Sequence, residues 1–300
     1  MLGLFMGTLA ACGGGSGGVS GSEPTGTLTI GLTDAPVDSV TAVWVQFSGV
    51  TLQPQGGGSA IEIPFSTITV DLSSLTGGNT ETLLASEPVP AGAYNWIELH
   101  VNAEFDTIMD SYVITEIGGQ EEIEIPGGAQ TGLRLVSGLT ITADQETSFL
   151  IDWDLRMGLV NPPGQPGYFL RPALRIIDMT QFGTLSGSVE ASLVMNMSCT
   201  NDLNADTGNA IYVFSGSDVV PDDIDEFDPN PVATAAVTQD QSGRYGYELL
   251  LSPGDYTATF TCQASDDLAD TDSSVPTPMS FVQPTNITVV NGEMGILNFP

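Results

Sequence analysis

Residues 93–101 read AYNWIELHV, and apolar and polar side chains alternate along this stretch. Because successive side chains of a strand point to opposite faces, the stretch predicts a β-strand with one apolar face and one mixed face. The apolar face holds Ile97, Leu99 and Val101, and the mixed face carries Tyr94, Trp96, Glu98 and His100.

Similar short runs recur along the chain, separated by Gly, Pro, Asn and Asp, and no window keeps the 3.6-residue period of a helix. This spacing predicts an all-β protein built as antiparallel β-sandwiches. The clearest further runs are Thr27–Leu32, Val40–Gly49, Ile61–Val70, Ser111–Glu116, Leu133–Ile141 and Ser148–Leu155.

The composition excludes several classes of function. The 300 residues favour two domains, and 37 Asp and Glu against 5 Lys and Arg give a formal charge of −32. Such a charge argues against nucleic acid as a partner, because nucleic-acid binding relies on basic contacts. With His100 as the only histidine and no lysine, a lysine Schiff base, a multi-histidine zinc site and a P-loop are also excluded.

The first twelve residues, MLGLFMGTLAAC, are too short to span a bilayer and are typical of the hydrophobic core of a secretion signal. A basic segment normally precedes such a core, so we expect the true start codon to lie upstream of Met1. Leu9–Cys12 resembles the lipobox of bacterial lipoproteins, which implies acylation of Cys12. Gly13 is not the Asp that favours inner-membrane retention, so the expected location is the outer membrane, facing the periplasm or the cell exterior. Residues 13–26 are expected to form a flexible tether.

Two cysteines are left once Cys12 carries lipid. In an exported protein an even pair favours a disulfide, so Cys199 and Cys262 are expected to be bonded; two buried thiols are the alternative.

Four blocks resemble the bacterial domain of unknown function 4382. They are GTLTIGLTDAPVD at 26–38, VQFSGVTL at 45–52, LIDWDL at 150–155 and YFLRPALR at 168–175. The resemblance covers about residues 26–180, within an expected first domain at 27–182. It implies an exported, often lipid-anchored β-sandwich module with no established chemistry.

An expected second domain occupies residues 183–300. Its stretch TQDQSGRYGYELLLSPGDY at 238–256 resembles the prealbumin-like repeat of carboxypeptidase regulatory domains, which implies a second immunoglobulin- or transthyretin-like sandwich. Asp240 and Gly243 suit a hairpin turn, and Pro253-Gly254 suits a β-turn. A last hairpin is expected from residues 287–290 and 294–299 around Asn291-Gly292.

A calcium site is expected in the second domain. Asp202, Asn204, Asp206 and Gly208 follow the spacing that opens a calcium-binding loop, without the later Glu of an EF-hand. The disulfide would bring this loop beside a second acidic loop, and the alternative is that both are solvated and only maintain solubility. The expected ligands are Asp202, Asn204, Asp206, Asp266, Asp267, Asp270 and Asp272, with the acidic loop at 222–228 as a further source.

Two other groups of side chains are candidates for specific roles. Tyr94, Trp96 and His100, with Trp44, are candidates for a glycan-binding platform, although a strand face covered by a loop or by the other domain is the favoured interpretation. Four arginines are expected to pair with local acids: Arg134, Arg156, Arg171 and Arg175.

These observations predict a non-catalytic envelope lipoprotein that acts as a binding or structural module and is stabilised by calcium. Its partners would be the membrane, through the lipid anchor, and a glycan or an envelope protein. The alternatives are a carbohydrate-binding module and a carbohydrate-active enzyme that uses two carboxylates, since paired acids cannot be located without the fold.

Overall fold

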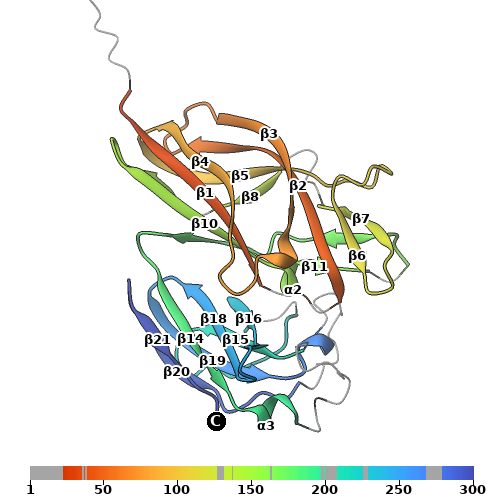
Figure 1. Ribbon diagram of the computed structural model, residues 1–300. Helices are drawn as coiled ribbons and strands as arrows, with labels where there is room; N and C mark the ends of the chain where they lie inside the picture. Colours follow the sequence, from red (N-terminus) through yellow and green to blue (C-terminus); the bar gives the residue numbers. More distant parts are fainter. Residues whose placement is uncertain are drawn as a thin grey trace, which may run out of the picture.

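The computed structural model describes residues 23–35, 37, 39–126, 132–136, 138–162, 164–196, 199, 208–225, 229–267 and 279–300. Almost all of their regular structure is β-strand, arranged as two stacked pairs of sheets (Figure 1). The expected all-β sandwich class is confirmed. None of the helices in the described ranges is long and apolar enough to span a bilayer.

We call residues 25–178 the first sandwich. One of its sheets has the strand order β13-β10-β1-β4, and β1 and β10 run parallel at its centre. This pair departs from a purely antiparallel sandwich. The strands are β1 (Thr25–Ala35), β4 (Glu81–Pro90), β10 (Glu146–Asp154) and β13 (Leu174–Asp178).

The facing sheet of the first sandwich has the order β11-β12-β7-β6-β2-β5-β8, with β3 paired to β2 and β9 paired to β5. Two helical turns accompany it, η1 (Leu72–Ser74) and α2 (Leu155–Gly158). The strands are β2 (Val40–Pro54), β3 (Ile61–Asp71), β5 (Gly92–Asn102), β6 (Tyr112–Thr115), β7 (Gln120–Glu124), β8 (Leu133–Leu135), β9 (Leu139–Ile141), β11 (Leu159–Val160) and β12 (Tyr168–Leu170).

The inward side chains of both sheets form one apolar core. At its centre the rings of Phe47 and Trp153, both fully buried, meet edge to face with centroids 6.5 Å apart. Alternating apolar residues on β1, β2, β5 and β10 supply the rest, as the period-2 pattern predicts.

We call residues 183–296 the second sandwich. Its sheets have the orders β17-β18-β14-β21 and β16-β15-β19-β20. The elements are β14 (Gly183–Val189), α3 (Ala191–Val194), β15 (Ala210–Ser215), β16 (Ala233–Ala236), β17 (Thr238–Gln239), β18 (Tyr245–Leu251), β19 (Gly254–Thr261), η3 (Ala264–Asp266), β20 (Thr285–Val289) and β21 (Met294–Ile296).

Turn chemistry in the second sandwich is as expected in one place and different in another. Asp240 accepts hydrogen bonds from the backbone of Ser242 and Arg244, and Gly243 has a φ of +81°, so the predicted turn joins β17 to β18. The expected last hairpin is wrong. β20 pairs with β19 and β21 pairs with β14, so the turn at Asn291-Gly292 carries the chain from one sheet to the other.

The described strands pair only within the first sandwich or only within the second, and the connection runs from Asp178 to Gly183. In Figure 1 the sheet that contains β1 and β10 lies next to β16 and β18 of the second sandwich. Met157 of α2 packs against a small cluster of the second sandwich that includes Tyr212 and Phe214. The two sandwiches therefore share a packed interface.

Candidate functional site

Strand β10 is buried on both faces, and its second face lies at the interface. Its apolar residues alternate with residues that leave the first core, so the acids emerge on the side that the second sandwich covers. Phe149, Ile151 and Trp153 belong to the first core, and Leu150, Asp152 and Asp154 do not, although each of the six is less than 10% exposed.

Asp154 links the two sandwiches directly. Its Oδ2 accepts hydrogen bonds from the backbone N–H of Thr234 at 3.0 Å and from the Thr234 hydroxyl at 2.9 Å. Its Oδ1 accepts the N–H of Met157 at 3.2 Å and caps α2. Burial, followed by the charge of Asp152, raises the pKa of Asp154, while the bond from Thr234 and the charge of Arg156 lower it. A buried carboxylate of the first sandwich is thus held by the second.

Asp267 is the corresponding buried acid of the second sandwich. It accepts a hydrogen bond from the Tyr212 hydroxyl at 2.6 Å, and its two oxygens lie 3.1 and 3.2 Å from the N–H of Ile224. Burial raises the pKa of Asp267 to about 6, against the bonds from Tyr212 and Ile224 and the charge of Arg156. The charge of Arg156 lowers the pKa of both Asp154 and Asp267, so one buried guanidinium stabilises the charged forms of acids from both sandwiches.

An interfacial cavity of about 440 Å³ lies beside these groups. One wall is the outer face of β10 and β13, where Arg175 donates from Nε to Oδ2 of Asp152 at 2.6 Å, and its Nη2 contacts the same oxygen. The loop at residues 76–80 forms a second wall, and β16, β17 and β18 form the third. Ligand sites occur preferentially at such domain interfaces, which makes this cavity the candidate functional site.

The predicted arginine pairing holds for Arg175 with Asp152 and for Arg134 with Glu98. Arg134 donates to Oε2 of Glu98 from Nε at 3.0 Å and from Nη2 at 2.7 Å. Its guanidinium carbon also lies 4.0 Å from the ring centre of Trp96, so a cation covers one face of this indole. Arg156 and Arg171 also take part in interactions.

The candidate residues of the aromatic platform do not lie together on one face. Tyr94 is only 3% exposed and belongs to the first core, with its hydroxyl donating to the Pro90 carbonyl at 2.6 Å. Alternation assigned Tyr94 to the mixed face, and a β-bulge explains why it lies on the core face instead. Gln53 pairs with Trp96 and Pro54 with Tyr94, so the extra residue Asn95 reverses the alternation.

Trp44 and His100, the other candidate platform residues, each contact a different neighbour. Trp44 lies nine positions before Gln53 on β2, roughly 30 Å away along the strand, and stacks on Tyr112 with centroids 6.3 Å apart. His100 is hydrogen-bonded through Nε2 to the hydroxyl of Thr51 at 2.7 Å. It is a strand residue with a local partner.

Most of the predicted calcium ligands fall outside the described residues: Asp202, Asn204, Asp206, Asp270 and Asp272. Of the other two, Asp266 is half-buried in η3, and Asp267 uses its carboxylate for Tyr212 and Ile224. Within the described part of the chain, no three His, Cys, Asp or Glu side chains are grouped so that they could hold a metal ion. Cys12 and most of the expected tether likewise lie outside the described residues.

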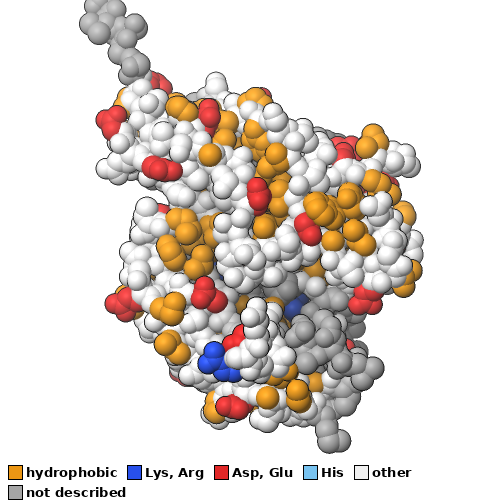
Figure 2. All heavy atoms as spheres, viewed as in Figure 1, with side chains coloured by type: hydrophobic (Ala, Val, Ile, Leu, Met, Phe, Trp, Pro, Cys, Tyr) orange, Lys and Arg blue, Asp and Glu red, His pale blue; other side chains and the backbone are white. Residues whose placement is uncertain are grey.

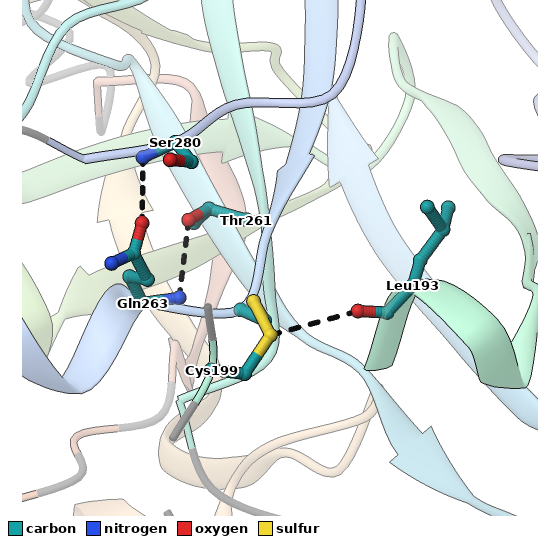
Figure 3. Close-up of a disulfide and its surroundings, with 6 residues drawn as sticks. Leu193, Cys199, Thr261, Gln263 and Ser280 are labelled. Atoms are coloured by element: carbon teal, nitrogen blue, oxygen red, sulfur yellow. Dashed lines mark hydrogen bonds between the residues drawn. A yellow bond between two sulfur atoms is a disulfide. The ribbon is translucent and has the colours of Figure 1, made fainter. Parts of the chain in front are cut away.

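The predicted disulfide is present. Cys199 and Cys262 are bonded, with Cα atoms 5.4 Å apart, and tie the segment after α3 to the end of β19 (Figure 3). Next to the bond, Oε1 of Gln263 accepts the N–H of Ser280 at 2.7 Å. The N–H of Ala264 donates to the carbonyl of Gly208 at 2.9 Å. The described ends of the two acidic loops therefore lie side by side.

Sequence reasoning did not identify the interfacial residues Thr234, Tyr212 and Glu248. A signal existed on β10, because Asp152 and Asp154 alternate with large apolar residues in a run that the sequence predicts to be a strand. Acids at such positions indicate that a second layer covers the outer face of the sheet.

The surface electrostatics match the composition. Figure 2 shows carboxylates scattered over the visible face rather than gathered in one patch, with few basic groups among them. The protein as a whole therefore repels anions, while the Arg175 guanidinium inside the cavity is neutralised by Asp152.

The solved structures that resemble the chain do so only weakly. Matches include a leucine-rich repeat protein from Bacteroides thetaiotaomicron (12% identity, TM-score 0.20) and the shaft pilin of Lactobacillus rhamnosus GG (13% identity, TM-score 0.20). The chain is covered to 92% and 93% in these two matches, which span 26% and 99% of the other chains. The minor pilin of Streptococcus agalactiae gives 9% identity and a TM-score of 0.19, with 91% of this chain and 94% of that chain covered.

The chain spans about a quarter of the length of the leucine-rich repeat protein and a third of the length of a further match, the TIE protein of Bacillus anthracis. At these TM-scores we base no functional argument on the likeness. The comparison with curated proteins gives no match.

A family model matches the first sandwich. The matched segment contains β1, the buried acids of β10 and α2, and the resemblance that its blocks suggested is confirmed for this part of the chain. Residues 25–172 of this protein match the family described as "Domain of unknown function (DUF4382)".

Proposed function

We propose that the protein is a non-catalytic lipoprotein of the bacterial outer membrane whose two sandwiches form one rigid binding or structural unit. The observation that carries the proposal is the buried link between the sandwiches, in which Asp154 accepts two hydrogen bonds from Thr234. Charged hydrogen bonds of this kind that are shielded from water are stronger than neutral ones and hold two surfaces in one orientation.

The use of the buried ionisable groups supports a structural role. Asp154 and Asp267 accept bonds from backbone N–H groups and from hydroxyls of Thr234 and Tyr212, which orient packed elements. A carboxylate that acts in general acid or base catalysis has to reach a substrate proton. Both acids are at most 7% exposed, and their hydrogen bonds are made within the fold.

The position of β1 supports anchoring through the N-terminal side. β1 begins at the end of the first sandwich that is remote from the second (Figure 1). A lipid on Cys12 would therefore place the first sandwich nearer to the membrane and hold the second sandwich away from it. The expected tether would end before Thr25, where β1 begins, and would allow the unit to reorient.

Membrane flotation tests this proposal. Replacing Cys12→Ser removes the only acylation site of the lipobox and is expected to release the protein from membranes. Gly13→Asp is the matched control and is expected to keep membrane association while moving the protein to the inner membrane. If Cys12→Ser floats with membranes as the parent protein does, the anchoring proposal is wrong. Turnover of any glycan by the purified protein would contradict the non-catalytic part.

A further inference from the structure

We propose that the interfacial cavity between the two sandwiches binds a neutral polyhydroxylated ligand, one or two sugar rings in size. The proposal goes beyond the envelope role and does not depend on the lipid anchor. The cavity, of about 440 Å³, falls within the range of small-molecule sites, roughly 300–1,000 Å³.

The first argument is that polar side chains, and not only apolar ones, line the cavity. An interface that serves only to join two domains is packed as densely as a protein interior. Here the outer face of β10 and β13 instead brings the Asp152–Arg175 pair to the cavity, and β18 brings Glu248 from the opposite side. The loop with Gly77 and Gly78, both with positive φ, runs close to Glu248 and encloses the space.

The second argument is hydrogen-bonding capacity that the described residues leave unused. Both contacts of Arg175 go to the same oxygen of Asp152, Oδ2. Within the described ranges, Arg175 Nη1, Asp152 Oδ1 and the Glu248 carboxylate have no hydrogen-bond or ion-pair partner. These groups line the cavity and are accessible to water, so the hydroxyls of a ligand can replace that water as hydrogen-bond partners.

The third argument concerns the charge of the ligand. Asp152 and Arg175 neutralise each other, which leaves Glu248 as the one uncompensated charge among the lining residues. An anion would be repelled by Glu248 and by the net charge of −32. Sugar hydroxyls fit both walls, because one hydroxyl can donate to a carboxylate while another accepts from the guanidinium.

The test uses the full chain carrying Cys12→Ser, titrated by calorimetry with a panel of neutral monosaccharides and disaccharides, and separately with spermidine and with inorganic phosphate. Thr238→Trp places a large ring at the cavity wall and is expected to weaken binding at least tenfold. The matched control is Gln239→Trp, the adjacent and equally exposed residue of β17, which does not line the cavity and should leave binding unchanged.

A second variant distinguishes a loss of binding from a folding defect. Glu248→Gln keeps the size of this exposed side chain at the cavity wall and is expected to weaken sugar binding several-fold without lowering the melting temperature. The proposal is overturned if no sugar of the panel binds, if Thr238→Trp and Gln239→Trp bind equally well, or if only spermidine or inorganic phosphate binds.

Discussion

At the scale of single residues, the protein buries acids where two sandwiches meet, and Asp267 makes the consequence measurable. The ordinary pKa of an aspartate, 3.8, is raised to about 6 by burial in the folded state. The folded protein therefore holds the proton more tightly than the unfolded chain. The contribution of protonated Asp267 to the stability of the fold is complete below pH 3.8 and is lost as the pH rises through about 6.

We expect the free energy of unfolding to be higher at pH 5 than at pH 8, with Asp267 contributing about 1.4 kcal/mol, because pH 5 lies about one unit below its raised pKa and one unit corresponds to 1.36 kcal/mol. Urea unfolding across this range measures it, and Asp267→Asn should flatten the slope. Asp240→Asn is the control, because the pKa of the exposed Asp240 is lowered to about 2 by its bond from Ser242, below the window. An unchanged slope in Asp267→Asn would contradict the prediction.

The hydroxyl of Thr234 gives a second prediction at this scale. Thr234→Val keeps the shape of the side chain but removes one donor to the buried Asp154, so we expect a loss of about 1–3 kcal/mol in the free energy of unfolding. Thr184→Val on β14 is the comparison, since that half-buried hydroxyl makes no hydrogen bond within the described ranges. Equal losses in the two variants would show that the link to Asp154 contributes nothing.

At the scale of elements, the alternating pattern locates strands well and their partners poorly. β2, β3 and β5 lie where alternation predicts them, because one face of each packs in the core. β4 carries a weaker pattern, with Pro88 and Pro90 and a positive φ at Ser86, and it pairs with β1 through irregular register. Partner choice depends on contacts between residues distant in sequence, which no local window contains.

Two errors show the same limit at finer detail. The bulge at Asn95 turned Tyr94 into the core, and alternation has no means of showing where a residue is inserted. Asn291-Gly292 does form a turn, but β20 pairs with β19 in one sheet and β21 pairs with β14 in the other. The partner of Asp154 was beyond prediction for a similar reason, because Thr234 lies 80 residues away in the sequence.

The two acidic loops still predict calcium binding. The disulfide and the bond from Ala264 to Gly208 hold the described ends of these loops together, and oxygen-rich irregular loops suit calcium better than magnesium. We expect calcium, and not magnesium, to raise the melting temperature, and Asp202→Ala with Asp206→Ala to abolish the rise. A calcium effect that persists in this double variant would falsify the site.

At the scale of the whole molecule, the arrangement of sheets predicts two folding units whose shared interface stabilises both. Expressed separately, residues 27–180 and 183–300 should each fold, as judged by near-ultraviolet circular dichroism, because each pair of sheets has its own core. Each piece should be less stable than in the full chain, since separation exposes Leu150 and Tyr212 and leaves Asp154 without Thr234. A piece without a near-ultraviolet signal would argue against the division.

The parallel pairing of β1 with β10 has a consequence for the order in which the first sandwich can form. Thr27 is in register with Glu146, so the first strand of the sandwich meets its central partner only after most of the sandwich has been synthesised. Closing so long a loop is slow, because its entropic cost comes before any contact compensates for it. We therefore expect β1 to pair with β10 later than β2 pairs with its sequence neighbour β3.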